Sequence, residues 1–199
     1  MWGAVRQRRR RFGRQEGAGS GGRQLFVLLL LFCMLGAACS KKKEESGGTS
    51  GDVGVEVGLL APELKVRNLK RGFSALSDYR GKVVLINFWA TWCGPCKAEM
   101  PSMEMLYQNY KRGDFEILAV SIDTEGEPRV RAFVEDFGFT FPILLDFAFM
   151  INDQYQVRVV PTSFLIDRHG KIAYRALGAR DWNDSESRAV VSRLIESKQ

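Results

Sequence analysis

Residues 83–96 read VVLINFWATWCGPC, and they combine the signal of a strand with the signal of a helix start. The first seven residues are mostly apolar, which is typical of a β-strand covered on both faces. Two cysteines follow at Cys93 and Cys96, with Gly94 and Pro95 between them. Proline suits the first turn of a helix, because the N–H it lacks would be unpaired there. The stretch therefore predicts a buried strand, a short turn and a helix that begins at the cysteine pair.

Strand and helix patterns alternate beyond this stretch. Apolar residues recur at helical spacing in some segments and stand in short runs in others. The expected elements are a helix over 96–110, a strand over 115–122, a helix over 129–137, a strand over 143–145, a helical turn over 149–155, a strand over 163–167, a hairpin turn at 168–170, a strand over 171–175 and a helix over 184–197. This order predicts an α/β fold with a central mixed β-sheet flanked by helices.

The first 38 residues have the composition of a bacterial secretory signal. They hold seven arginines and one glutamate, which accounts for the whole net charge of +6. The remaining charges balance, which excludes a broad basic face for nucleic acid. The apolar run over 25–35 has eleven residues, fewer than the ~18–20 that cross a bilayer as a helix. We therefore expect a cleaved signal over 1–38 rather than a retained anchor.

Three small residues beginning with Gly36 precede Cys39, which resembles the lipobox of bacterial lipoproteins. In that motif the cysteine becomes the lipidated first residue, and Gly36 stands where leucine is usual. Arginines at 9–11 loosely resemble a twin-arginine export signal, although arginine runs are common in basic leaders. Residues 39–58 are rich in Lys, Glu, Ser and Gly without apolar periodicity. They predict a flexible tether to a folded domain over 59–199.

The mature domain keeps two of the four cysteines, Cys93 and Cys96. Thiols at this spacing can form a redox-active disulfide or carry a reactive thiolate. The alternatives are half of a zinc site and a purely structural disulfide. Zinc would need two more ligands, and the only histidine, His169, stands in a predicted turn. Structural bridges usually close longer loops, so we expect a redox-active pair and no metal.

The segment Trp-Cys-Gly-Pro-Cys at 92–96 resembles the thioredoxin active site. Further patterns stand at 61–63, at 76–82 and at 160–162, the last about 65 residues after the cysteines. With them, residues 59–197 are similar to the membrane-tethered TlpA/ResA-like thiol–disulfide oxidoreductases of bacterial envelopes. The resemblance implies a thioredoxin-like fold with no cofactor other than the cysteine disulfide itself.

The residues themselves also indicate roles for single positions. At the helix start, backbone N–H groups would stabilise Cys93 as the attacking thiolate, and Cys96 would be the resolving thiol. The motif also includes Trp92, Pro95 and Gly94, and we expect Gly94 to allow a tight turn beside the sulfurs.

A second segment matches the substrate-binding loop of thioredoxin-like folds. Pro161 corresponds to their cis-proline opposite the reactive cysteine. The Val160 backbone would then pair with an extended substrate segment.

The proton acceptor is less obvious. Thioredoxins carry a buried aspartate where this chain has Asn87, which cannot move a proton. Glu99, one helical turn after Cys96, matches an acidic residue that ResA-like proteins use near their thiols. The residue pattern alone leaves Glu99 open as an acid/base or as a solvated helix residue.

The predicted function is reduction of disulfides in exported proteins on the periplasmic side of the envelope. Electrons would come from a membrane thiol donor, and cytochrome c maturation would supply a client by analogy. One rival is a redoxin-type thiol peroxidase, which would need Thr and Pro where this chain has Ala90 and Ile86. Another is a copper or haem chaperone using Met100 and Met103, although core packing explains that spacing more simply.

Overall fold

The structure is a computed structural model that describes residues 52–70 and 72–197. The predicted signal, Cys39 and the predicted tether up to residue 51 lie outside the described residues. Within the described ranges, no helix has the length and apolar character that crossing a membrane requires.

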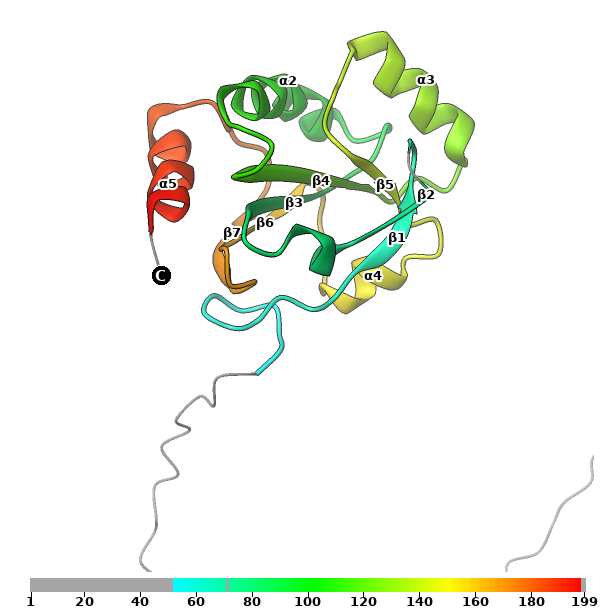
Figure 1. The fold of residues 1–199 in the computed structure, drawn as a ribbon. Coiled ribbons are helices and arrows are strands. Elements are labelled where there is room, and N and C mark those ends of the chain that lie inside the picture. The colour runs from blue at the N-terminus through cyan, green and yellow to red at the C-terminus, as the bar shows by residue number, and fades with distance from the viewer. Residues whose placement is uncertain (1–51, 71, 198–199) are drawn as a thin grey trace, which may run out of the picture. The chain divides into compact units, whose positions relative to one another are not determined.

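A seven-stranded mixed sheet forms the centre of the domain, with the strand order β2-β1-β5-β4-β3-β6-β7 (Figure 1). The strands β3, β4 and β5 run parallel to one another, and every other neighbouring pair is antiparallel. This arrangement confirms the predicted α/β fold with a central mixed sheet. The strands are β1 (Lys65–Asn68), β2 (Gly72–Ala75), β3 (Val83–Trp89), β4 (Phe115–Ser121), β5 (Ile143–Leu145), β6 (Thr162–Ile166) and β7 (Ile172–Leu177).

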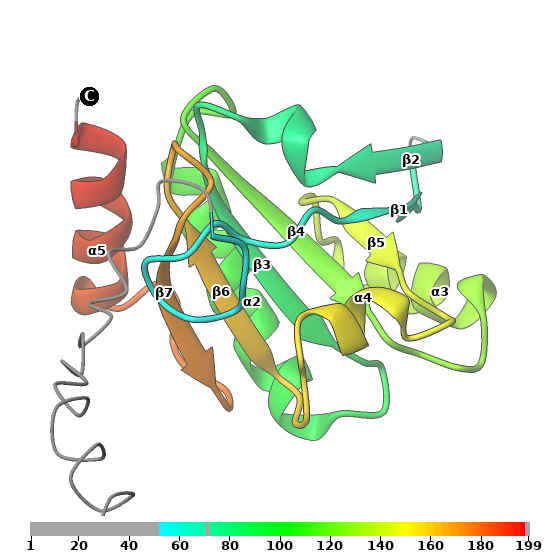
Figure 2. The same ribbon diagram turned by 90° about the horizontal axis from the view of Figure 1, so that it is seen from below.

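Helices cover both faces of this sheet. They are the 3-10 helix η1 (Leu76–Tyr79) and the α-helices α2 (Gly94–Asn109), α3 (Glu127–Phe137), α4 (Met150–Gln154) and α5 (Ser185–Glu196). The connections from β3 to β4 and from β4 to β5 place α2 and α3 on one face (Figure 1). The helix α4 lies on the other face and α5 lies beside β7 (Figure 2).

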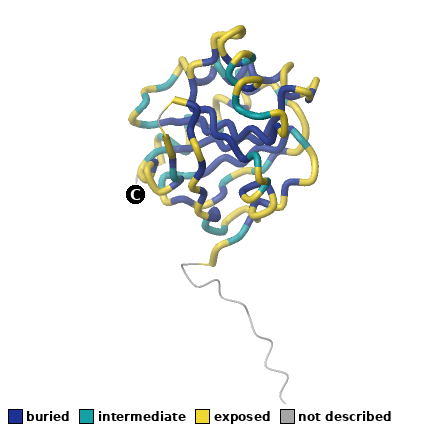
Figure 3. The backbone as a smooth tube through the Cα atoms, turned by 90° about the vertical axis from the view of Figure 1, so that its right-hand side faces the viewer, coloured by how far each residue is buried: buried dark blue, intermediate teal, exposed yellow. Residues whose placement is uncertain are grey.

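The two central parallel strands are buried along their whole length. All seven residues of β3 and all seven of β4 are buried, as expected for strands covered on both faces. Figure 3 shows this buried backbone in dark blue at the middle of the domain. The turn that leads from β3 to Cys93 therefore starts from a fully enclosed part of the domain.

Some elements differ from the predicted ones. The strands β1 and β2 were not predicted, because each has four residues and only alternate positions of β1 are buried. The helix α2 begins at Gly94, earlier than the predicted residue 96, since Cys93 serves as its N-cap.

The predicted domain start at Leu59 is wrong, because residues 52–58 are folded. The Val55 side chain is 4% exposed within the core. The N–H of Gly54 donates to the Leu60 carbonyl at 3.0 Å, and the N–H of Gly58 donates to the Ile172 carbonyl at 2.8 Å. A buried side chain and paired backbone groups give these residues fixed places that a tether would lack.

Candidate active site

Cys93 and Cys96 are joined by a disulfide bond at the start of α2, with the sulfurs 2.05 Å apart. Cys93 is the N-cap of the helix, and its Sγ accepts a hydrogen bond from the Cys96 N–H at 3.2 Å. Unpaired N–H groups and the positive end of the helix dipole favour negative charge at this position. The geometry therefore favours the thiolate of Cys93 once the disulfide is reduced.

The loop before β6 lies opposite the disulfide. Its Val160–Pro161 peptide bond is cis, which is the geometry that the resemblance implied. The Val160 carbonyl oxygen lies 3.6 Å from Cys93 Sγ. The N–H of Gly178 donates to the Pro161 carbonyl at 2.9 Å, which ties this loop to the end of β7. The predicted substrate-binding residues and the predicted nucleophile are thus brought together.

The other motif residues face solvent. The Trp92 side chain is 56% exposed beside Cys93, and Gly94 and Pro95 are exposed at the helix start. The reason expected for Gly94 is wrong: its φ is not in the left-handed region, and a Cβ there would meet no atom within 4 Å. A residue with a side chain fits this turn, and glycine instead leaves the space beside the sulfurs open.

Glu99 is buried rather than solvated, with 3% of its surface exposed. Asn87 Nδ2 donates to Glu99 Oε1 at 2.7 Å, and the backbone N–H of Arg180 donates to Oε2 at 3.2 Å. Burial raises the pKa of Glu99 to about 7, although these hydrogen bonds act in the opposite direction. The carboxyl group therefore changes charge close to neutral pH. Among the described residues, it makes no direct hydrogen bond to either sulfur.

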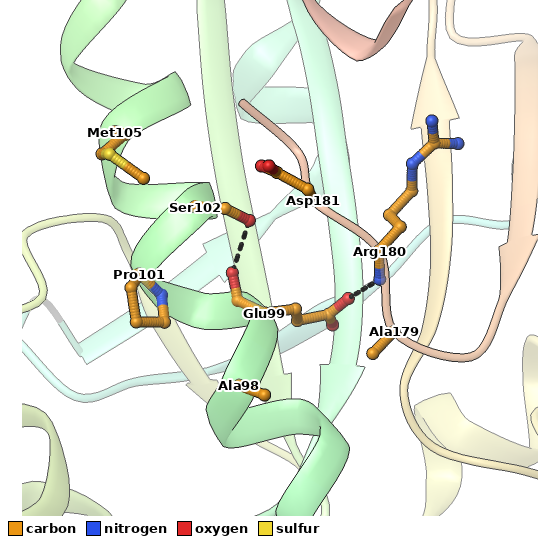
Figure 4. A pocket seen from close by; sticks show the side chains of 8 residues that line it. All are labelled: Ala98, Glu99, Pro101, Ser102, Met105, Ala179, Arg180 and Asp181. Atoms are coloured by element: carbon orange, nitrogen blue, oxygen red, sulfur yellow. Dashed lines mark hydrogen bonds between the residues drawn. The ribbon is translucent and has the colours of Figure 1, made fainter. Parts of the chain in front are cut away.

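A cavity of about 460 Å³ lies beside Glu99. Figure 4 shows the Glu99 carboxylate directed toward the Arg180 backbone across this cavity. The wall is formed by α2 and by the loop after β7, and its residues are Ala98, Glu99, Pro101, Ser102, Met105, Ala179, Arg180 and Asp181. Glu99 thus contacts a space large enough for several water molecules, which gives a buried carboxyl group a route for its proton.

Comparison with known proteins gives the family. A family model described as AhpC/TSA matches residues 57–175. The chain belongs to the AhpC/TSA family. The thiol-disulfide oxidoreductase ResA of Geobacillus kaustophilus is 46% identical over 134 residues, covering 66% of this chain and 75% of that protein.

Two further matches agree. The thioredoxin-like protein YneN of Bacillus subtilis is 42% identical over 123 residues, covering 61% of this chain and 71% of that protein. The thioredoxin domain of a thiol-disulfide oxidoreductase from Bacteroides vulgatus matches with a TM-score of 0.62 and 26% identity. That match covers 71% of this chain and 99% of the other. These matches confirm the predicted resemblance and the thioredoxin-like fold.

Residues that the rival functions would use lie in unsuitable places. Met100 and Met103 are fully buried in the core, so core packing explains their spacing. His169 is exposed in the turn between β6 and β7, as predicted. Within residues 52–70 and 72–197, no group of three His, Cys, Asp or Glu side chains is placed to hold a metal ion.

Sequence reasoning missed one pair of residues at the site of this AhpC/TSA chain. The carboxylate of Asp123 binds both the backbone and the hydroxyl of Thr91, two residues before Cys93. An acidic residue two positions after a buried strand that pairs with β3 was the available signal, because 32 positions separate the two residues.

Proposed function

We propose that this protein reduces disulfide bonds of exported proteins, with Cys93 as the attacking thiol and Cys96 as the resolving thiol. The protein is a thiol–disulfide oxidoreductase like the relatives that it matches, and its substrates are disulfide-bearing proteins. One observation carries the assignment of roles. Cys93 sits at the helix start facing Val160, with 5% of its surface exposed, whereas Cys96 is fully buried.

The exchange proceeds in two steps that balance. The Cys93 thiolate attacks one sulfur of the substrate disulfide, and the other substrate sulfur leaves as a thiolate that takes up a proton. The Cys96 thiol then loses its proton and attacks Cys93 Sγ. This attack breaks the mixed disulfide, and the second substrate sulfur leaves as a thiolate that takes up a proton. The substrate has gained two electrons from the Cys93 and Cys96 sulfurs, which are oxidised to the Cys93–Cys96 disulfide. The Val160 backbone would bind the substrate segment next to its disulfide.

Glu99 is the proposed acceptor for the Cys96 proton. Its pKa of about 7 suits a group that must accept and release a proton near neutral pH. Because no direct hydrogen bond links Glu99 to a sulfur within the described ranges, a bridging water from the adjoining cavity would carry the proton.

The cellular setting follows from the leader. We propose that the chain is exported, that Cys39 is lipidated, and that the domain stays tethered on the outer side of the membrane. A membrane thiol donor would restore the reduced state, and apocytochrome c is a candidate client. The cysteine pair would serve without a bound cofactor. Unmodified wild-type protein in the soluble periplasmic fraction would count against the lipid anchor.

The test compares three activities of the purified domain. We expect wild type to speed the reduction of insulin by dithiothreitol and Cys93→Ser to be inactive. Cys96→Ser should instead trap a mixed disulfide with insulin, since resolution is blocked. Failure of wild type to reduce insulin would reject the proposed function. Turnover of peroxide or tight binding of Cu(I) in parallel samples would favour the rival peroxidase or chaperone.

A further inference from the structure

A second buried carboxylate lies at the active-site end of the sheet. Asp123 stands two residues after the end of β4 and is fully buried. Its oxygens accept hydrogen bonds from the Thr91 N–H at 3.1 Å, the Thr91 hydroxyl at 2.6 Å and the Ser121 hydroxyl at 2.8 Å. Burying a carboxylate is costly unless donors surround it, and here three donor groups do so.

Two of these donors belong to the turn that carries the nucleophile. Thr91 lies between the end of β3 and Cys93, and its hydroxyl oxygen also accepts a hydrogen bond from Arg129 Nε at 2.9 Å. Arg129 in turn pairs with Glu125 at 2.8 Å on the surface. The charged groups facing the Thr91–Asp123 pair therefore come from the chain between β4 and α3 and from α3 itself.

The turn has few other attachments. The N–H of Cys93 donates to the Ala90 carbonyl at 3.1 Å within the turn. Just before the turn, the N–H of Ile122 donates to the Trp89 carbonyl at 3.0 Å. In the described part of the chain, the Asp123 carboxylate is thus the main link between the turn and the neighbouring strand.

We propose that Asp123 is a positioning residue for the thiol exchange, acting through Thr91 to hold Cys93 at the N-cap of α2. The role rests on the proposed function of Cys93. In this position, Cys93 Sγ accepts a hydrogen bond from the Cys96 N–H at 3.2 Å and faces the Val160 carbonyl oxygen. A turn that is released from Asp123 would lose this alignment, and the helix start would stabilise the thiolate less.

The direction in which the stability of the Cys93 thiolate changes distinguishes a positioning role of Asp123 from a direct electrostatic effect of its charge. If the negative charge of Asp123 acted on Cys93 directly, its removal would make the thiolate easier to form. If Asp123 acts by positioning, its removal makes the thiolate harder to form. Thr91→Val keeps the charge and removes the hydroxyl, so only the positioning role predicts an effect of that variant in the same direction.

The experiment measures alkylation of the reduced Cys93 thiol by iodoacetamide from pH 5 to 9, with mass spectrometry to assign the site. We expect Asp123→Asn to be alkylated about three- to tenfold more slowly than wild type at pH 6. The midpoint of its rate profile should move up by roughly half to one pH unit. Thr91→Val should show a smaller change in the same direction, and Thr91→Ser should restore the wild-type profile.

The matched control is Glu116→Gln on β4, the strand that precedes Asp123. Glu116 is also buried and accepts the Tyr107 hydroxyl at 2.7 Å, but it lies at the opposite end of β4. This variant should lose thermal stability and keep the wild-type alkylation profile. A control that moved the profile as far as Asp123→Asn does would overturn the proposal, because general destabilisation would then explain both.

A wild-type profile for Asp123→Asn, or faster alkylation at pH 6, would also overturn it. If Asp123→Asn does not fold, Thr91→Val decides, and an unchanged profile in that variant rejects the positioning role. Insulin reduction by wild type is measured in the same series. Its failure would reject the proposed function, whereas an unshifted profile with active wild type would reject only the role of Asp123.

Discussion

Thioredoxins carry a buried aspartate at the strand position that Asn87 occupies in this chain. Here the carboxyl group that contacts this position belongs to Glu99. Asn87 is fully buried on β3 and cannot titrate, yet its amide donates to the carboxyl group that does. The same amide also donates to Ser163 Oγ at 2.9 Å, which fixes its orientation. In this chain the carboxyl group with a pKa of about 7 stands on α2, where it borders the cavity.

Substituting Glu99 by glutamine tests whether its carboxyl group takes part in proton transfer during disulfide exchange. Glu99→Gln preserves the shape of the side chain and removes the group with a pKa of about 7. We expect folded protein whose disulfide exchange is slower above pH 6 and lacks a titration near pH 7. Stopped-flow measurement of insulin reduction across pH 5 to 9 checks this. A profile identical to that of wild type would leave Glu99 a structural residue only.

Asn87→Asp gives a second test at this scale. The new carboxyl group would stand at hydrogen-bond distance from Glu99 Oε1, where Asn87 Nδ2 now lies at 2.7 Å. Two carboxyl groups so close share one proton near neutral pH, and their titrations are coupled. We expect the melting temperature of this variant to fall more steeply than that of wild type between pH 6 and 8. Parallel melting curves over this range would contradict the contact.

At the scale of elements, residues 52–58 belong to the folded domain, although their composition is typical of a flexible tether. Valines alternate at 53, 55 and 57 among glycines and acidic residues, and only Val55 is buried. Val55→Ala should lower the free energy of unfolding by about 1–2 kcal/mol, since it removes buried apolar atoms.

The exposed neighbours provide the control for that variant. Val53 is 63% exposed and Val57 is 61% exposed, so alanine at either position should change the free energy of unfolding by less than about 0.5 kcal/mol. Urea denaturation of the three variants measures the difference. Equal effects at all three positions would mean that this segment is not packed as described.

Sequence patterns predicted the elements that are long and uniformly buried. The apolar run predicts β3 and the helical spacing predicts α2, and the two cysteines stand at the start of that helix, Cys93 as its N-cap and Cys96 in its first turn. The four-residue strands β1 and β2 escape prediction, because so few residues cannot establish an alternation.

The surroundings of the site were harder to predict. Glu99 lies on the helix face that the sequence indicated, but its burial depends on the loop at Arg180, 81 positions away. The pairing of Thr91 with Asp123 likewise depends on the neighbouring placement of β3 and β4. Patterns among neighbouring residues carry no information about contacts between residues 32 or 81 positions apart, so these contacts are seen only in the folded chain.

At the scale of the whole molecule, Glu99 couples stability to pH. Its pKa is about 7 in the folded protein and 4.5 in the unfolded reference. Between these values only the folded state keeps the proton, so its stabilising contribution is complete at low pH and is lost as pH rises through 7. We expect wild type to lose about 2–3 kcal/mol more than Glu99→Gln between pH 4.5 and 8. Urea titrations at each pH measure this, and equal losses would refute the raised pKa.

The reduction potential of the Cys93–Cys96 disulfide is a property of the whole domain. The dipeptide Gly94-Pro95 between the cysteines is that of thioredoxin, and we expect a reducing potential nearer to ~−270 mV than to ~−120 mV. Equilibration with glutathione buffers measures it. A value above about −180 mV would contradict a reducing role.

The folded N-terminal segment has a consequence for how the domain is presented. Register pairs Val84 with Ile166 and Phe88 with Thr162, so the β6–β7 hairpin lies at the end of β3 far from the cysteines. Residues 58–61 bind that hairpin. A seven-residue strand spans roughly 20 Å, so the chain enters the domain at the pole opposite the disulfide. Trp92 and Val160 therefore lie at the end of the domain away from residue 52, and immobilising the domain over residues 52–197 through a biotin at residue 52 should preserve the rate of insulin reduction per molecule.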